Sequence, residues 1–230
     1  MISICIPTYE MGGVGVKYLD ESLKAIKGQT YKDFEVVISD HSTTNDIEDL
    51  CKLWTSELEI QYHRNTNKRG SSSANINNAM RHAKGDITKI LFQDDYLYGD
   101  DSLEIQLKYF TDNQSTWLAT AYRHINQYVY GTTHNPSYND NIQYGRNTIG
   151  APSGVMIKSD IGIEFDESLI WLMDCDYYKR VYDVAGLPTI CNEPTVVNRE
   201  HEQQVTNVLA TNQIKEKELS YIKRKYGNTN

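Results

Sequence analysis

The stretch ITKILFQDDYL, residues 87–97, is a short apolar strand that runs directly into two carboxylates. Residues 90–92 are expected to be buried, whereas Asp94 and Asp95 repel each other, and burial makes that repulsion worse. A chain that ends a buried strand in this way either caps the next helix with a solvated turn or positions the pair for a cation. The stretch therefore predicts a core strand with a candidate site at its carboxyl end.

Strands and helices are expected to alternate four times across the first ninety residues. Between the strands, apolar residues recur at helical spacing, as at Val16, Leu19, Leu23 and Ile26. This alternation is typical of a parallel α/β sheet with helices on both faces, in which ligands bind at the carboxyl ends of the strands. The predicted strands cover residues 2–7, 34–39, 58–63 and 87–92.

The second half of the chain has a different pattern. The character shifts near residue 98 to that of a mixed sheet, and no linker or repeat marks a domain boundary. Helices are predicted over 101–110, 174–186 and 212–230, and strands with a turn over 116–135, followed by a strand over 154–159.

Charge and composition limit the partners of this chain. It carries 23 Lys and Arg against 31 Asp and Glu, a formal net charge of −8. An acidic surface repels a phosphate backbone at long range, which argues against nucleic-acid binding and suggests that any phosphate is bound through a cation. The composition does not predict an oligomeric state.

Cysteine usage and hydropathy bear on localisation. The four cysteines form no Cys-x-x-Cys pair, which favours buried thiols in a reducing compartment. The first ten residues do not form a signal peptide, and no apolar run is long enough to cross a membrane. We therefore expect a cytoplasmic protein that contacts a membrane at most peripherally, through lysines of its final helix.

Five segments together resemble glycosyltransferase family 2, an inverting, nucleotide-sugar-dependent family with the GT-A fold. The resemblance implies a Rossmann-like nucleotide-binding half with a mostly parallel sheet, residues 1–98, joined to a mixed-sheet acceptor and catalytic half, residues 99–230, in one continuous domain. The matching segments are ISICIPTYE (2–10), SLKAIKGQTYKDFEVVISDHSTTND (22–46), HAKGDITKILFQDDYL (82–97), WLMDCDYYKRV (171–181) and REHEQQVT (199–206).

The resemblance implies a divalent cation, Mn²⁺ or Mg²⁺, that bridges the two phosphates of the donor. A hard cation neutralises the charge that the diphosphate gains as it leaves, and it prefers oxygen ligands. Asp95 and His201 would hold this ion, and Asp94 would contact the ribose or the donor sugar. Arg199 is an alternative phosphate ligand to His201. The departure from the family is Gln93, where many members carry an acid.

The nucleotide pocket implied by the resemblance lies at the ends of the first two strands. Thr8, Tyr9 and Asp40 would contact the base, with the carboxylate accepting the uracil N–H and the aromatic ring packing on the base. Pro7 would fix the backbone where the chain turns toward the ligand. Arg69 would pair with a phosphate. The competing interpretations are that Asp40 caps the following helix and that Arg69 belongs to a solvated loop.

The resemblance also implies a catalytic base in the segment LMDCDYYKRV. An inverting transfer needs a group that takes the proton of the attacking acceptor hydroxyl. Asp174 matches the second member of the family's Glu-Asp pair, and Met173 replaces the first. Asp176 is the alternative base, and both acids would otherwise only cap a helix N-terminus.

The expected reaction is sugar transfer from a nucleotide donor, most simply UDP-linked, to a hydroxyl of a saccharide or lipid-linked acceptor. Two other classes remain open. A non-catalytic binding module for a sugar nucleotide or a saccharide is favoured by the acids missing at Gln93 and Met173. A sugar-1-phosphate nucleotidyltransferase would need a basic, glycine-rich segment after the first strand, where PTYEMGGVGVK offers only Lys17.

Overall fold

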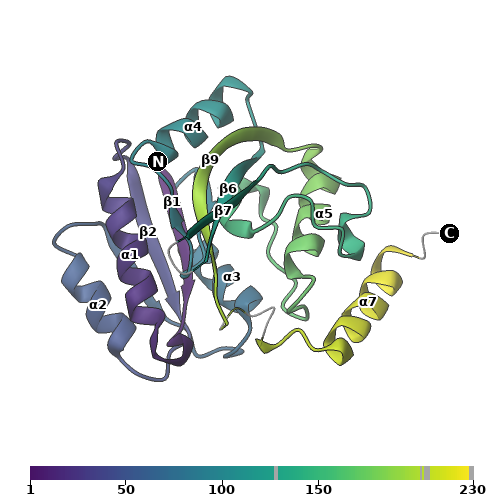
Figure 1. Cartoon of the computed structure of the whole chain (residues 1–230), viewed down its shortest axis with the longest axis horizontal. Coiled ribbons are helices and arrows are strands. Elements are labelled where there is room, and N and C mark those ends of the chain that lie inside the picture. The colour runs from purple at the N-terminus through teal and green to yellow at the C-terminus, as the bar shows by residue number, and fades with distance from the viewer. Residues whose placement is uncertain (127–128, 203, 205–207, 228–230) are drawn as a thin grey trace.

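A computed structural model describes residues 1–126, 129–202, 204 and 208–227 of the chain (Figure 1). Strands and helices alternate as predicted in the first half, and a set of strands with mixed pairing and longer loops follows. The strands are β1 (Ile2–Thr8), β2 (Phe34–Asp40), β3 (Ile60–Arg64), β4 (Ile87–Ile90), β5 (Tyr96–Leu97), β6 (Trp117–Asn126), β7 (Val129–His134), β8 (Val155–Lys158) and β9 (Thr189–Glu200). The α-helices are α1 (Gly15–Gly28), α2 (Asp46–Trp54), α3 (Ser72–His82), α4 (Ser102–Asp112), α5 (Met173–Ala185) and α7 (Asn212–Tyr226). Short 3₁₀ turns lie at Met11–Gly13, Ile142–Tyr144, Pro152–Gly154 and Ser159–Ile161.

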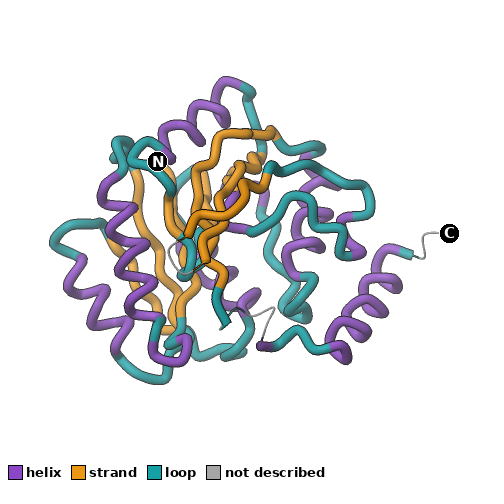
Figure 2. The backbone as a smooth tube through the Cα atoms, viewed as in Figure 1, coloured by secondary structure: helices purple, strands orange, loops and turns teal. Residues whose placement is uncertain are grey.

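One sheet runs through both halves of the molecule (Figure 2). Its strand order is β3-β2-β1-β4-β8-β6-β9-β5, with β7 paired to β6. The strands β3, β2, β1 and β4 are mutually parallel, as the alternating pattern predicts, and β8 pairs antiparallel with β4. The predicted α/β fold with a parallel half joined to a mixed half is therefore confirmed.

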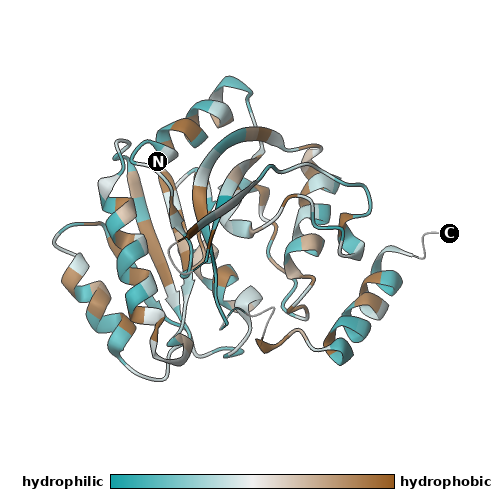
Figure 3. Ribbon diagram, in the orientation of Figure 1, coloured by the Kyte–Doolittle hydropathy of each residue, from teal (hydrophilic) through white to brown (hydrophobic). Residues whose placement is uncertain are grey.

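The two faces of the sheet are covered by different helices. Because side chains alternate along a strand, Ile4 and Ile6 of β1 pack with α1, α2 and α4 on one face. Cys5 packs on the opposite face, with α3, α5 and Ile222 of α7. Figure 3 shows β1 and β2 as largely hydrophobic ribbons between helices whose outer sides are hydrophilic. This double cover explains why the first strands read as continuous apolar runs.

The long strand β9 is the element that the sequence pattern does not predict. Its segment TICNEPTVVNRE contains a polar run and Pro194, which interrupt strand periodicity. In the structure the pairing of β9 with β6 shifts register around Ala121, and this irregularity accommodates the proline. Beyond it, Val196 and Val197 pair with the short strand β5. The carboxyl end of β9 thereby arrives beside Asp94 and Asp95, which immediately precede β5.

The structure bears on the predictions about the cysteines and about membrane-spanning segments. Cys5, Cys51, Cys175 and Cys191 are buried thiols. Within the described ranges no helix has both the length and the apolar character that crossing a bilayer requires. The border near residue 98 stays a prediction, since one sheet continues across it.

Candidate active site

A cavity of about 350 Å³ opens at the carboxyl ends of β1 and β4. Four of the residues predicted to bind a nucleotide line it, namely Pro7, Tyr9, Arg69 and Asp94. The predicted residues Thr8 and Asp40 lie behind this wall and are both fully buried. Further lining residues, which the sequence did not single out, include Glu10, His41, Thr43, Asn75 and Gln204.

Gln93 joins the end of β4 to the loop that follows β1. Its Oε1 accepts the backbone N–H of Tyr9 at 2.9 Å, and its Nε2 donates to the carbonyl oxygen of Gly15 at 2.7 Å. A carboxylate in this position would have no N–H to donate, so the amide that departs from the family pattern has a structural role. A Cβ at Gly15 would lie 2.2 Å from the carbonyl oxygen of Tyr9, so glycine is required for this close approach.

Asp94 and His201 meet at the edge of the cavity. Nε2 of His201 lies 2.9 Å from Oδ2 of Asp94, although the two residues are 107 positions apart in the chain. The ring of His201 also lies 5.2 Å, centroid to centroid, from that of Tyr18 in α1. The structure thus brings together two of the residues that the sequence assigned to donor binding. Gln203 and residues 205–207, in the segment that follows His201, lie outside the described residues.

Asp95 points into the protein rather than into the cavity. It is 2% exposed, and its Oδ1 accepts hydrogen bonds from Nδ2 of Asn198 at 3.0 Å and from the backbone N–H of Arg199 at 3.2 Å. Burial raises the pKa of the Asp95 carboxyl, and the neighbouring charge of Asp94 raises it further. Asp94 thus lines the cavity while Asp95 is held by protein donors behind it, and the roles predicted for the two acids stay predictions.

Arg199 holds the start of β5 against α1. Its guanidinium donates to the backbone carbonyl oxygen of Asp94 and pairs with the carboxylate of Glu21. The centroids of the Tyr18 and Tyr96 rings lie 4.8 and 4.4 Å from the guanidinium carbon. With these contacts in place, the guanidinium supports the protein backbone, and the alternative role of Arg199 as a phosphate ligand stays a prediction.

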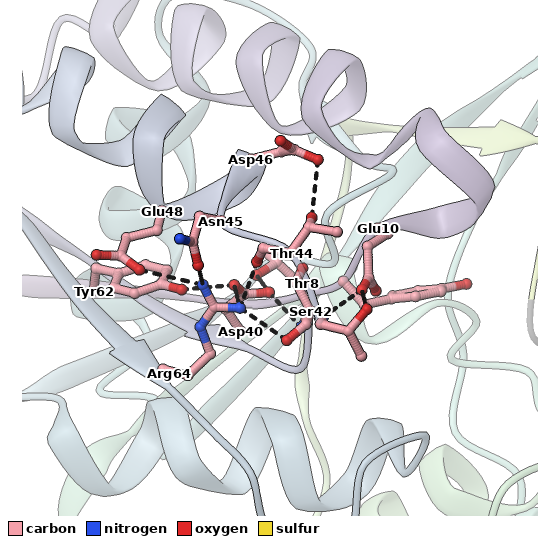
Figure 4. Close-up of polar contacts among 12 residues, drawn as sticks. Thr8, Glu10, Asp40, Ser42, Thr44, Asn45, Asp46, Glu48, Tyr62 and Arg64 are labelled. Carbon is pink, nitrogen blue, oxygen red and sulfur yellow. Dashed lines mark hydrogen bonds and ion pairs between the residues drawn. The ribbon is translucent and has the colours of Figure 1, made fainter.

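Asp40 is the centre of a polar network below the cavity (Figure 4). Its carboxylate accepts hydrogen bonds from the Tyr62 hydroxyl at 2.7 Å, from the backbone N–H of Ser42 at 2.9 Å and from Thr8 Oγ1 at 3.3 Å. Arg64 lies 3.5 Å away and also binds the carbonyl oxygen of Ser42 at 2.8 Å. The network fixes the loop after β2 that carries His41, and it already uses both oxygens of the predicted base-binding carboxylate.

Asp174 stands in the first turn of α5 with its carboxylate oriented from two sides. Oδ1 accepts the backbone N–H of Cys175 at 2.7 Å, and Oδ2 accepts Nδ2 of Asn147 at 2.6 Å. Asn147 is itself held by Gly150, whose N–H donates to its Oδ1 at 2.8 Å. Burial raises the pKa of Asp174 to about 6. An oriented carboxyl group with this pKa is suited to accept a proton near neutral pH.

The alternative base, Asp176, has other partners. It is fully buried, and it binds Nε of Arg180 at 2.7 Å, the Tyr226 hydroxyl at 2.7 Å and Nζ of Lys225 at 2.7 Å. Met173, which replaces the family's glutamate, is buried with its sulfur 3.7 Å from Oγ of Ser73 in α3. The geometry therefore favours Asp174 over Asp176 as a proton acceptor.

Tyr122 of β6 connects the environments of the two acidic segments. Burial raises its pKa to about 12, and the charges of Asp95 and Asp174 both add to that shift. The phenol also packs against Gly150, where an added Cβ would lie 2.5 Å from the ring and from its hydroxyl oxygen. The Asp95 and Asp174 carboxylates therefore both lie close enough to the Tyr122 phenol to act on its charge.

A divalent cation can be accommodated by Asp94 and His201. In the described part of the chain, no group of three or more His, Cys, Asp or Glu side chains is arranged to hold a metal ion. Mg²⁺ in phosphate-transferring sites commonly takes one or two protein ligands and completes its shell with water and substrate phosphates. One carboxylate oxygen and one imidazole nitrogen, 2.9 Å apart at the cavity edge, fit that kind of site.

Several residues that contact the candidate site residues are not predicted by the sequence pattern. Asn198 was missed because β9 was not expected as a strand, and Asn147 lies in a polar loop without periodicity. Glu218 of α7 accepts backbone N–H groups that precede α5, from Ile170 and Leu172 among others. One signal existed for Glu218, because it is four residues from both Ile214 and Ile222 and thus lies on the apolar stripe of its helix.

Curated proteins similar to this chain include an uncharacterized glycosyltransferase of Rickettsia conorii, 31% identical over 126 residues and 55% of this chain. Another is the GalNAc(5)-diNAcBac-PP-undecaprenol beta-1,3-glucosyltransferase of Campylobacter jejuni, 28% identical over 97 residues and 42% of this chain. The matches cover only 20% of the length of the first relative and 30% of the second.

Solved structures share the fold. The fragment 1–349 of S. aureus TarS, in complex with UDP-GlcNAc, superposes with a TM-score of 0.78 at 18% identity, over 100% of this chain and 67% of the fragment. The mannosyltransferase PcManGT from Pyrobaculum calidifontis, in complex with GDP-Man and Mn²⁺, gives a TM-score of 0.62 at 18% identity, over 86% of this chain and 56% of its own. At this level of identity, the similarity establishes the architecture.

The family model of glycosyl transferase family 2 matches residues 3–180. This match includes the parallel strands β1 to β4 except Ile2, most of the residues that line the cavity, and the first turn of α5 with Asp174. The chain belongs to glycosyltransferase family 2.

Proposed function

We propose that this chain is a glycosyltransferase that transfers a sugar from a nucleoside-diphosphate donor, UDP-linked, to a hydroxyl of a saccharide or lipid-linked saccharide, with inversion. One observation carries the proposal. Asp94 and His201 meet at 2.9 Å on the edge of a cavity at the carboxyl ends of parallel strands, which is where such sheets bind nucleotides. Residues 1–98 would supply most of the donor site and residues 99–230 the acceptor site and the base.

The donor nucleotide would occupy the cavity beneath Tyr9. A volume of about 350 Å³ lies in the range of small-molecule sites. Tyr9 is 38% exposed and can pack on the base, and Arg69 on the opposite loop can pair with a phosphate. Asp40 would act indirectly, by holding the loop that carries His41.

Asp94 and His201 would hold a divalent cation, with Asp95 supporting the strand end behind them. When bound, such an ion neutralises the charge that the departing diphosphate gains. Arg199 fixes the backbone of Asp94 through its carbonyl oxygen, so the carboxylate faces the cavity without rearrangement. The Mn²⁺ in the PcManGT complex supports the choice of ion.

Asp174 would take the proton of the acceptor hydroxyl. The acceptor oxygen forms a bond to the anomeric carbon, the bond from that carbon to the diphosphate oxygen breaks, and the proton passes to the Asp174 carboxylate. Asn147 orients Oδ2 by its hydrogen bond of 2.6 Å. This single displacement requires no enzyme nucleophile.

The relatives support the donor and acceptor classes by the names they carry. TarS was crystallised with UDP-GlcNAc, and the name of the Campylobacter jejuni relative specifies an undecaprenol-linked acceptor. A lipid-linked acceptor would bring this chain to the inner face of a membrane as a peripheral protein.

A non-catalytic module that binds a sugar nucleotide is the second candidate, favoured by Gln93 and Met173 in place of acids. A nucleotidyltransferase is a third and would produce pyrophosphate. The deciding experiment incubates the protein with a panel of nucleotide sugars and saccharide acceptors, with Mn²⁺ or with EDTA, and measures nucleoside diphosphate. A parallel reaction supplies nucleoside triphosphates with sugar 1-phosphates and measures pyrophosphate. The proposal predicts acceptor-dependent release of nucleoside diphosphate with Mn²⁺. Pyrophosphate release, or binding of the donor without turnover across the panel, would reject it.

A further inference from the structure

The last helix, α7, buries a carboxylate where an amphipathic helix would bury an apolar side chain. Glu218 is 5% exposed and lies one turn before Ile222, which is fully buried in the core beneath α5. Figure 1 shows α7 on the α5 side of the sheet. A buried carboxylate is retained in a protein only where hydrogen bonds or charges satisfy it.

Glu218 is satisfied by three consecutive backbone N–H groups. Oε1 accepts that of Ile170 at 2.7 Å, and Oε2 accepts those of Trp171 at 3.0 Å and Leu172 at 2.8 Å. Leu172 is the N-cap residue of α5, and its side chain has no polar atom for capping. Glu218 therefore accepts, from another helix, the N-cap N–H that the glutamate of a capping box usually accepts, together with the two N–H groups that precede it.

The segment that Glu218 holds leads directly into the proposed base. Leu172 precedes Asp174 by two residues, and the Asp174 carboxylate is fixed to the same turn through the N–H of Cys175. A displacement of residues 170–172 moves the first turn of α5, and the carboxylate would lose its alignment with Asn147. Misplacement of about 1 Å at a reacting group lowers rates about a hundredfold.

Glu218 also contributes charge to the surroundings of Asp174. The titratable groups around that carboxyl are Cys175 and Tyr178 in α5, Tyr122 in β6 and Glu218 in α7. Burial is the main cause of the raised pKa of Asp174, and the negative charge of Glu218 raises it further.

The remaining contacts of α7 do not depend on Glu218. Lys225 pairs with Asp166 at 2.8 Å and with Asp176 at 2.7 Å, and Tyr221 donates to Asp166 at 2.7 Å. Ile222 supplies the apolar contact. A substitution at Glu218 that keeps the side-chain shape therefore leaves the helix attached, so its effect on the start of α5 can be measured separately.

We propose that Glu218 is a positioning residue for the reaction, which holds residues 170–172 and thereby aligns the Asp174 carboxylate with the acceptor hydroxyl. The inference rests on the proposed function. It adds a residue outside the family match, which ends at residue 180. The transferase site is thus completed by the last helix of the chain.

The test compares Glu218→Gln with Glu216→Gln, a matched control on the exposed side of the same helix. Steady-state kinetics are measured with the active donor and acceptor from pH 4.5 to 8.5. For Glu218→Gln the expected result is a fall in kcat of about ten- to a hundredfold with an unchanged KM for the donor. The acid limb of its pH profile should move to lower pH, because a negative neighbour is lost. Glu216→Gln should match the wild type.

Glu218→Asp keeps the charge on a shorter side chain, and it should recover the wild-type position of the acid limb with part of kcat. If Glu218→Gln does not fold, the same kinetic comparison is made with Glu218→Asp. The inference would be overturned if Glu218→Gln had the kcat of the wild type. It would also be overturned if the KM for the donor rose by the same factor by which kcat fell.

A second readout separates failure of the inference from failure of the proposed function. Carboxyl ¹³C NMR of Asp174 in wild type and Glu218→Gln reports its pKa without turnover. A lower pKa in the variant supports the contact even if no donor is consumed by the wild type. An unchanged pKa and an unchanged Asp174 chemical shift would overturn the inference whatever the enzyme's activity.

Discussion

Nε2 of His201 lies 2.9 Å from Oδ2 of Asp94, so the segments that follow β9 and β4 meet beside the cavity that Asp94 lines. The contact exists because β9 pairs antiparallel with β5, the short strand that begins directly after Asp95. A residue from the second half of the chain is thereby placed against the first. The predictions that follow test what this arrangement does.

Replacement of either member of this pair is expected to weaken donor binding that depends on the cation. In Asp94→Asn and in His201→Ala, affinity for UDP in the presence of Mn²⁺ should fall about ten- to a hundredfold, the usual range for disturbed metal sites. Affinity measured with EDTA should change little. Isothermal titration calorimetry with UDP gives both values, and Asp112→Asn at the exposed end of α4 is the control. Equal Mn²⁺-dependent affinity in the wild type and both variants would remove the pair from the ion site.

Asp95→Asn separates the two adjacent acids. The amide oxygen can still accept hydrogen bonds from Asn198 and Arg199, so the free energy of unfolding should fall by about 1 kcal/mol or less. Asp95→Ala leaves those donors unpaired and should lose about 2 kcal/mol, measured by urea denaturation. Mn²⁺-dependent UDP affinity should survive in Asp95→Asn. If that variant loses affinity as strongly as Asp94→Asn, the direct-ligand role predicted from the sequence is correct.

Replacement of Asp40 is expected to lower the stability of the protein more than its affinity for UDP. Asp40→Ala leaves the Tyr62 hydroxyl and the buried N–H of Ser42 without their acceptor, and this should cost about 2–3 kcal/mol. Tyr62→Phe removes one of these hydrogen bonds and should cost about 1–2 kcal/mol. Chemical denaturation and UDP titration on the same samples give the comparison. Normal stability together with a lost preference for uridine over cytidine nucleotides would instead place Asp40 on the base.

Asp174→Asn should abolish transfer while the donor still binds. General-base catalysis contributes about 10²- to 10⁴-fold, so kcat should fall by that factor. Asp174 does not line the cavity, so its replacement removes no contact with the bound nucleotide. The affinity for UDP should therefore stay within about twofold of the wild-type value. Asp183→Asn, at an exposed position of the same helix, is the control. Full turnover in Asp174→Asn would refute the assignment, and turnover lost only in Asp176→Asn would transfer the role to Asp176.

The pH dependence of transfer should report the Asp174 carboxyl. Its pKa is raised to about 6 by burial, and only the ionised form can accept a proton, so kcat should fall as the pH drops through about 6. Because the folded pKa exceeds the unfolded value, the contribution of this group to stability increases as pH falls below 6, opposite to its effect on rate. Asn147→Ala removes a donor to the ionised form and should move the acid limb upward by about half a unit or more. If the acid limb of the pH profile lies at the same pH in Asn147→Ala and in the wild type, Asp174 is not the group that produces it.

Much of the fold could be predicted because strands buried on both faces and helices with one apolar face have distinct sequence periods. Residues 2–7 and 34–39 read as continuous apolar strands, and each became a central strand of the sheet. β9 could not be predicted, since Pro194 and its polar neighbours break the strand period and only the pairing partners β6 and β5 define it.

For the candidate site, the sequence predicts which residues gather near the cavity, and the role of each residue stays a prediction. The order of the motifs identified Asp94, Asp95, His201 and Asp174 as candidates. The choice between the adjacent Asp94 and Asp95 depends on which side of the chain faces Asn198 and Arg199, a contact across about a hundred residues that no local pattern encodes. Glu218 reaches the start of α5 from a distance of 46 residues, and again only the tertiary structure reveals its partners.

The most direct test of the central claim is a crystal of the protein grown with UDP and MnCl₂ and measured for the anomalous signal of manganese. An ion held between Oδ2 of Asp94 and Nε2 of His201, with the diphosphate beside it and the uracil under Tyr9, is the predicted result. Manganese bound by Asp95 alone, or a nucleotide bound away from the cavity at the ends of β1 and β4, would contradict it.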